Sequence, residues 1–241
     1  MLLMPIDNRM LQSSFRQGLL QGVPIFIGYF PAAVAFGLLA RNGGLDFFAV
    51  LLFSMTNFAG ASQFLALNLI LSGAALYEII TGVLLVNLRY LLMSASLRPK
   101  LRCGFLLRGL AAFGNTDEVF AVASLRGSYL EPRYMAGIEA VAYAGWVSGT
   151  VTGYLFGAVL PGPIQAAVGG TLYALFAALL VPEVKREGRN LVVAGLAAAI
   201  NCIMVYGVGL SIGWSFVVAL IAAALFGAFY IPASPEYREA V

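Results

Sequence analysis

The feature that constrains this chain most is a series of long stretches without charged residues. The first of them, residues 17–40, carries no charged side chain over 24 residues. As an α-helix it would be about 36 Å long at about 1.5 Å per residue, and the hydrocarbon core of a bilayer is about 30 Å thick. This stretch is therefore predicted to be a transmembrane helix.

Seven further hydrophobic stretches follow along the chain. The second stretch of the chain, residues 47–77, is too long for one upright helix, and the polar run TNFAGASQ in its middle predicts a break between two half-helices. The remaining expected spans are residues 79–97, 105–125, 134–160, 164–181, 191–208 and 214–230. We predict an all-α polytopic membrane protein with about seven or eight hydrophobic helical segments. Residues 1–241 would form a single transmembrane domain, with a cytoplasmic segment 1–16, halves 17–125 and 134–230, and a tail 231–241.

Composition supports this fold class and excludes several functions. Hydrophobic residues make up 61% of the chain and charged residues 10%, a balance typical of proteins dissolved in lipid. The net charge of +3 is scattered, which argues against nucleic-acid binding. The chain has no histidine, and its two cysteines lack metal-ligand spacing, so we expect no metal and no cofactor. Chemistry must come from carboxylates, amides and arginine.

Basic residues indicate how the chain crosses the membrane. Arginines precede the first span, and four basic residues lie within 98–108, after the third stretch, so both groups should be cytoplasmic. Three full crossings would place these two groups on opposite sides of the membrane. We therefore expect residues 47–77 to form re-entrant half-helices, which return to the side from which they entered. A similar but weaker argument applies to residues 164–181, because the basic residues that follow them would lie outside the cell if this stretch crossed the membrane fully.

The two halves also show a weak similarity. Phe36-Gly37 resembles Phe156-Gly157, and Asn87 and Asn201 lie midway along corresponding helices. Under this topology the halves would run in opposite directions, as in the inverted repeats of many secondary transporters. Chance similarity between helices built for close packing explains the pattern equally well.

Glycines recur at every fourth position in the fifth span, at Gly145, Gly149, Gly153 and Gly157. At this spacing they share one helix face, where another backbone can approach closely. We expect a helix contact, within the chain or with a partner, rather than a substrate groove.

Arg89 is the most informative charge, because it lies near the centre of the third stretch. An arginine at that depth costs about 2.5–3.5 kcal/mol on insertion scales, so it requires a partner. The carboxylates available at membrane depth are Asp117, Glu118 and Glu139, and we expect one of them to face Arg89.

Two interpretations of this pair stay open. A structural pair would lock two helices together. In a wet cavity, Arg89 could instead bind a substrate carboxylate, and a partly desolvated Asp117 or Glu118 could take up and release protons. The candidate substrate-binding residues are Asn57, Ser62, Gln63, Asn87 and Arg89. Their amides and hydroxyl could equally form hydrogen bonds between helices.

The same residues carry a family resemblance. The stretches FAGASQF (58–64), NLRYLLM (87–93) and TDEVFA (116–121), together with FRQG (15–18) in the first helix, resemble the AzlC family. That family comprises large subunits of branched-chain amino acid exporters, and the similarity extends over residues 15–125.

The resemblance implies an exporter of branched-chain or similar hydrophobic amino acids in the bacterial cytoplasmic membrane. It also implies a small hydrophobic partner subunit of the AzlD type. Two positions depart from the family pattern, which commonly has histidine at Tyr90 and leucine at Asn115. A tyrosine hydroxyl does not exchange protons near neutral pH as histidine does, so a proton role does not carry over to Tyr90.

Other functions remain alternatives. A passive channel, or a transporter for another small solute, would share the topology and differ in coupling and pocket shape. A structural subunit whose partner carries the substrate would suit the glycine face equally well. The motifs HExxH, GxSxG and Walker A are absent, so we do not expect an enzyme.

Overall fold

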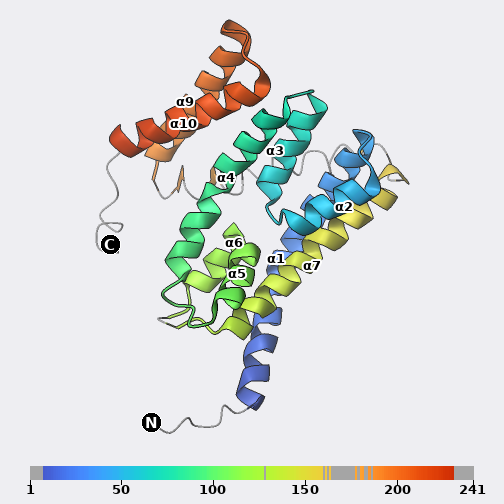
Figure 1. Ribbon diagram of the computed structural model, residues 1–241, viewed down its shortest axis with the longest axis vertical. Helices are drawn as coiled ribbons and strands as arrows, with labels where there is room; N and C mark the ends of the chain where they lie inside the picture. The colour runs from blue at the N-terminus through green and yellow to red at the C-terminus, as the bar shows by residue number, and fades with distance from the viewer. Residues whose placement is uncertain are drawn as a thin grey trace. The chain divides into compact units, whose positions relative to one another are not determined.

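The computed structural model describes residues 8–127, 129–159, 161, 163, 177, 180–181, 184–185 and 187–230. The chain divides into two compact units. Unit 1 comprises Met1–Phe64 and Val86–Leu172, and unit 2 comprises Leu65–Leu85 and Tyr173–Val241. Two helices pass from one unit into the other, and Figure 1 labels all the helices that follow.

The described part of the chain is helical. Unit 1 contains α1 (Asn8–Asn42), α2 (Phe47–Thr56), the start of α3 (Gly60–Leu71), the end of α4 (Leu76–Leu97), α5 (Phe105–Gly114), α6 (Asp117–Ser124), α7 (Pro132–Phe156) and the 3₁₀ turn η1 (Gly157–Val159). Unit 2 contains the remainder of α3 and α4, α9 (Arg189–Cys202), the π-helical turn η2 (Ile203–Gly207) and α10 (Ile212–Tyr230).

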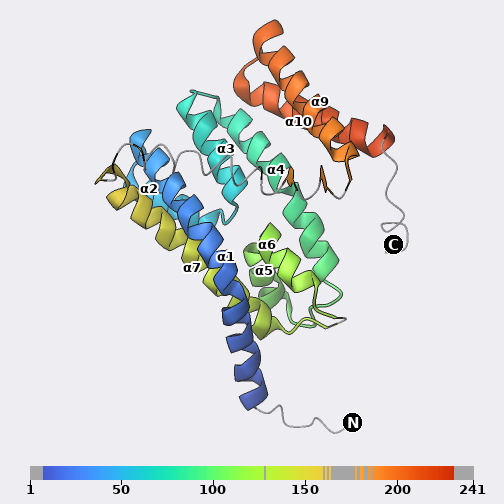
Figure 2. The same ribbon diagram turned by 180° about the vertical axis from the view of Figure 1, so that it is seen from behind.

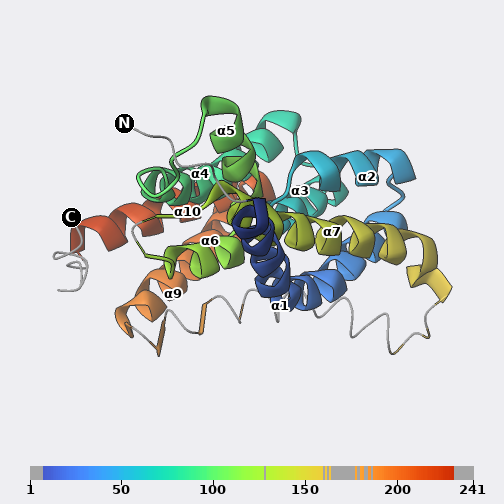
Figure 3. The ribbon, with the colours of Figure 1, turned by 90° about the horizontal axis from the view of Figure 1, so that it is seen from below.

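Helices α1 and α7 form the most extensive helix–helix contact of unit 1, and they lie side by side in Figures 1 and 2. The glycine face of α7 packs on α1, as expected. A methyl group added at Gly149 would lie 2.6 Å from the Phe30 carbonyl oxygen. The N-terminal turns of α1 extend beyond α7, and Figure 3 shows them almost end-on.

The order of these contacts corrects one expectation. Gly145 faces Phe26, Gly149 faces Phe30, and Gly157 faces Leu38, so residue numbers rise together along both helices. Helices α1 and α7 therefore run in the same direction. The inverted relation expected from Phe36-Gly37 and Phe156-Gly157 is wrong for this pair, and their similarity reflects close packing between glycine-containing helices.

An aromatic cluster fills the core of unit 1. Trp146 of α7 lies within 5.6–6.5 Å, centroid to centroid, of the rings of Tyr29, Phe36 and Phe64. Most of these pairs meet edge to face, the arrangement that aromatic quadrupoles favour. The cluster joins α1, α3 and α7, and so fixes the start of α3 against the α1–α7 pair.

Unit 2 joins the hairpin of α3 and α4 to the hairpin of α9 and α10. Both turns contain a glycine with positive φ, Gly73 at 72° and Gly209 at 75°, a conformation that favours glycine. The two hairpins meet where the Ser211 hydroxyl donates a hydrogen bond of 2.6 Å to the buried Glu78 carboxylate.

Several expected spans match the observed helices. By length and composition, four described helices can cross a membrane, namely Ser14–Asn42, Leu76–Leu97, Arg189–Gly207 and Ile212–Phe229. Residues 47–77 contain the two short helices α2 and α3, as predicted. Residues 105–125, expected to be one span, also form two helices, α5 and α6. Most of the expected span 164–181 lies outside the described residues.

Candidate functional site

The first break in a helix occurs at residues 57–59, between α2 and α3. Asn57 caps the end of α2 through its backbone N–H, which donates to the Phe53 carbonyl. The Gln63 side chain then donates to the carbonyls of Phe53, at 3.0 Å, and Asn57, at 2.6 Å. These bonds hold the first turn of α3 against the last turn of α2, so the chain folds back on itself.

Gln63 is completely buried and fully bonded within the protein. Its side-chain oxygen accepts hydrogen bonds from Trp146 Nε1, at 2.8 Å, and from the Ser54 hydroxyl, at 3.5 Å. With both N–H donors also used, all four hydrogen-bonding positions of the amide are occupied. These contacts favour the structural interpretation of Gln63, as a lock on the break.

The second break, at Asn115 and Thr116, separates α5 from α6. The Thr116 hydroxyl caps α6 by accepting from the Val119 N–H, at 3.5 Å. Asp117 and Glu118 lie in the first turn of α6, where the partial positive charge of the helix N-terminus stabilises carboxylates. The break thus places two acidic side chains inside unit 1.

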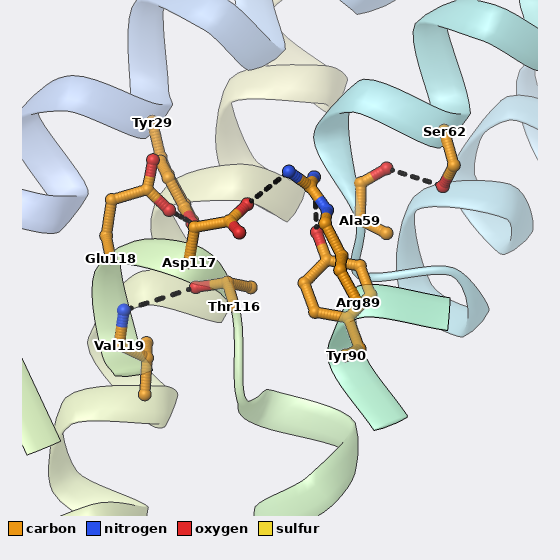
Figure 4. Close-up of polar contacts among 9 residues, drawn as sticks. All are labelled: Tyr29, Ala59, Ser62, Arg89, Tyr90, Thr116, Asp117, Glu118 and Val119. Atoms are coloured by element: carbon orange, nitrogen blue, oxygen red, sulfur yellow. Dashed lines mark hydrogen bonds and ion pairs between the residues drawn. The ribbon is translucent and has the colours of Figure 1, made fainter. Parts of the chain in front are cut away.

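Arg89 of α4 pairs with Asp117, as Figure 4 shows. Its Nη1 lies 3.0 Å from Asp117 Oδ2, and its Nη2 donates to the Tyr90 hydroxyl at 3.2 Å. Arg89 lies near the middle of α4, 13 residues or about 20 Å along the helix axis from its first residue, Leu76. The expectation that a carboxylate faces Arg89 is confirmed, and Asp117 is that carboxylate.

This ion pair is partly open. The side chains of Arg89 and Asp117 retain 34% and 26% of their accessible surface. A pair that only locked two helices would be expected in dry packing. The packing of the described residues does not seal off either charge.

Two buried polar atoms in the C-terminal half of α4 lack hydrogen-bond partners among the described residues. They are the Nε of Arg89 and the side-chain oxygen of Asn87. The amide nitrogen of Asn87 donates to Asn57 Oδ1 at 3.4 Å, which links α4 to the first break. Buried polar groups are normally hydrogen bonded, so each of these two atoms is an unsatisfied group on α4.

Glu118, the next residue after Asp117, contacts helix α1. The Tyr29 hydroxyl of α1 donates a hydrogen bond to Glu118 Oε2, and Figure 4 shows the two side chains directed toward each other. Glu118 and Asp117 are neighbours in sequence but contact different partners. The first turn of α6 therefore connects α1 to Arg89.

The structure gathers the predicted site residues into two groups. Asn57, Ser62, Gln63 and Asn87 surround the first break through mutual hydrogen bonds, while Arg89, Asp117 and Glu118 meet at the second. Ser62 bonds to the Ala59 carbonyl at 3.0 Å and accepts from Asn57 at 3.3 Å. The third candidate partner of Arg89, Glu139, instead packs its carboxyl group against Gly114.

Sequence reasoning missed Tyr29 and Trp146. Both belong to long apolar helices, where an aromatic residue normally indicates packing. The useful signal was that each carries a polar tip that must find a partner when buried. It also missed Ser94, which accepts a hydrogen bond of 3.3 Å from the Asn115 amide. Within the described residues, no group of three or more Cys, Asp or Glu side chains could hold a metal ion.

Known proteins resemble this chain over most of its length. The AzlC protein family matches residues 24–160. An uncharacterized membrane protein of Archaeoglobus fulgidus is 38% identical over 188 residues, which are 77% of this chain and 83% of that protein. The inner membrane protein YgaZ of Escherichia coli is 32% identical over 93% of this chain and 95% of its own length.

A more distant relative has a name that states a function. The branched-chain amino acid transport protein AzlC of Bacillus subtilis is 23% identical over 81% of this chain and 78% of its own length. No solved structure matches the chain.

Proposed function

Because this chain belongs to the AzlC family of membrane proteins, we propose that it exports branched-chain or similar hydrophobic amino acids across the bacterial cytoplasmic membrane. It would act as the large subunit of a two-component exporter, together with a small AzlD-type hydrophobic subunit. The name of the Bacillus subtilis relative supports the substrate class. The observation that carries the proposal is the partly exposed Arg89–Asp117 ion pair, which joins α4 to the first turn of α6 at the second helix break.

The groups around this pair suit an amino acid zwitterion. The side chain of Arg89 keeps 34% of its accessible surface, and its guanidinium donors can bind the substrate carboxylate. The free oxygen of Asn87 and the carboxylate of Asp117 can accept hydrogen bonds from the substrate ammonium group. A bound amino acid would thus replace part of the Arg89–Asp117 attraction with contacts to both of its charged groups.

Broken helices contribute partial charges to the same position. The backbone N–H groups that begin α6 are free of intrahelical partners, and short helices of this kind form the ion and substrate sites of many transporters. In this mechanism Asp117 and Glu118 also accept and release the coupling proton. The bond from Tyr29 would hold Glu118 in position between α1 and α6.

The direct test is leucine transport by proteoliposomes that contain this chain and its small partner subunit. We expect labelled leucine to cross faster than in empty liposomes, and faster still under a pH gradient. Arg89→Gln and Asp117→Asn should each abolish transport while membrane abundance stays near normal. Arg102→Gln, an exposed arginine in the loop before α5, is the matched control and should transport normally.

The doubly neutral variant separates the transport role from a helix lock. Arg89→Gln combined with Asp117→Asn leaves neither charge without its partner, so any loss of abundance that a lone charge causes in a single variant should be relieved. If the pair only holds helices together, this variant should recover transport with abundance. We expect abundance without transport, and recovered transport would refute the proposal.

Proton coupling has its own test at Glu118. Glu118→Gln keeps a hydrogen-bond acceptor for Tyr29 but cannot carry a proton. Exchange of internal for external leucine should persist in this variant, whereas transport driven by a pH gradient should be lost. A variant that still responds fully to the gradient would remove Glu118 from the coupling mechanism.

A further inference from the structure

A cavity of about 480 Å³ lies within unit 1, between the C-terminal half of α4 and helix α5. Its volume falls in the range of about 300–1,000 Å³ that small-molecule sites occupy. It is distinct from the Arg89–Asp117 pair, because neither of those residues lines it. The site described above therefore leaves this cavity without a function.

The walls of the cavity are apolar, and its outer end is basic. Its lining includes Leu91 and Ala95 of α4 and Phe105 and Ala112 of α5. Arg98, just beyond the end of α4, and Arg108, one turn into α5, line the end near the loop that joins the two helices. The site thus combines two guanidinium groups with a hydrophobic interior.

The inner end approaches the ion pair. It is lined by Ser94 and by Asn115, which is joined to Thr116 and Asp117 at the second break. Asn115 is 98% buried, and its side-chain oxygen has no hydrogen-bond partner among the described residues. From Arg98 to Leu91 the cavity extends over seven residues, or about 10 Å of helix.

We propose that this α4–α5 cavity is a cytoplasmic access site, which binds a hydrophobic L-amino acid before it reaches Arg89. The inference rests on the proposed function. Arg98 or Arg108 would take the carboxylate at the outer end, because guanidinium groups bind carboxylates in a two-pronged geometry. The branched side chain would contact the apolar walls, and the molecule would then move inward toward Asn115 and Asp117.

Charge and polarity favour this occupant. The basic residues in 98–108 belong on the cytoplasmic side, where an exporter must collect its substrate. An aliphatic amino acid offers one carboxylate to the rim and an apolar side chain to the walls. An anionic lipid has a similar distribution of charge, so the experiment includes it as a separate arm.

Thiol protection tests this site without relying on transport. In a background with Cys103→Ser and Cys202→Ser, Ala112→Cys places a small reactive group on the cavity wall. Inside-out vesicles are treated with a membrane-impermeant thiol reagent, with or without L-leucine, L-lysine or a short-chain phosphatidylglycerol. Arg102→Cys, which is exposed but does not line the cavity, is the matched control.

We expect leucine to slow labelling of Ala112→Cys more than lysine does, and to leave Arg102→Cys unaffected. Removing both rim charges with Arg98→Gln and Arg108→Gln should raise the half-protecting leucine concentration about ten- to hundredfold, the range for one charge-assisted hydrogen bond. Arg89→Gln should abolish transport and leave this protection in place.

Three outcomes would overturn the inference. They are no labelling of Ala112→Cys in the absence of leucine, labelling that leucine does not slow, and protection by phosphatidylglycerol alone. If any of them occurs while wild-type vesicles still transport leucine, the access site fails and the proposed function stands. If leucine is neither transported nor protective, both fail.

Discussion

The packing of α1 on α7 predicts a large difference between two glycines of unit 1. Gly149 of α7 lies so close to α1 that an added methyl group would be 2.6 Å from the Phe30 carbonyl oxygen and 2.7 Å from the Ala33 Cβ. Neither neighbour is the end of a flexible side chain, so the helices must separate. Gly28 of α1 is exposed and has nothing within 4 Å of the same added group.

Gly149→Ala should therefore destabilise the protein, and Gly28→Ala should not. Overpacking of a well-packed contact costs about 1–3 kcal/mol, and in a chain of this size each kcal/mol lowers the unfolding midpoint by about 2–4 °C. We expect the midpoint of heat-induced unfolding in detergent to fall by roughly 2–12 °C for Gly149→Ala. For Gly28→Ala it should stay the same or rise slightly, because alanine favours helix by up to about 1 kcal/mol.

Equal midpoints for the two variants would refute the reasoning. They would mean that α1 and α7 do not approach each other closely along the glycine face. A lower midpoint for Gly28→Ala alone would place the close contact on the opposite side of α1.

Two further changes test the hydrogen bonds around the breaks. Trp146→Phe removes the donor to Gln63 and should destabilise the protein by at least about 1–3 kcal/mol, because the amide oxygen loses its best partner in a buried position. A stability equal to wild type in detergent melting would show that Gln63 does not lock the first break. Tyr29→Phe removes the hydrogen bond to Glu118, worth about 1.5–3 kcal/mol to a charged acceptor, and should slow leucine transport in proteoliposomes at unchanged protein amount. Transport at the wild-type rate would show that the hydrogen bond from Tyr29 of α1 to Glu118 does not contribute to transport.

The sequence predicted the first break better than the second. The run around Asn57 is polar and rich in small residues, so it stands out within an apolar stretch. The second break lies in a stretch that is apolar on average. Thr116 followed by two acidic residues is nevertheless a helix start signal, since threonine caps and carboxylates suit the first turn. Because residues 105–125 are hydrophobic on average, a prediction from hydrophobicity alone gives one continuous span there and overlooks this signal.

The sequence predicts that Arg89 pairs with a carboxylate, but it does not predict which one. An arginine within a membrane span needs a carboxylate, and Arg89 has one. The choice of Asp117 over Glu139 depends on the second break, which turns α6 toward α4. The bonds of Tyr29 and Trp146 join helices far apart in sequence, and no local pattern in the chain indicates them.

In the proposed mechanism, water and substrate reach the polar groups of α4 around Arg89. In the cysteine-free background, Asn87→Cys should react with an impermeant thiol reagent, and leucine should slow that reaction. Leu92→Cys, on the exposed apolar face of the same helix, should stay unreactive because lipid covers it. An unreactive Asn87→Cys, or a reaction rate that leucine leaves unchanged, would contradict a wet substrate site at the Arg89–Asp117 pair.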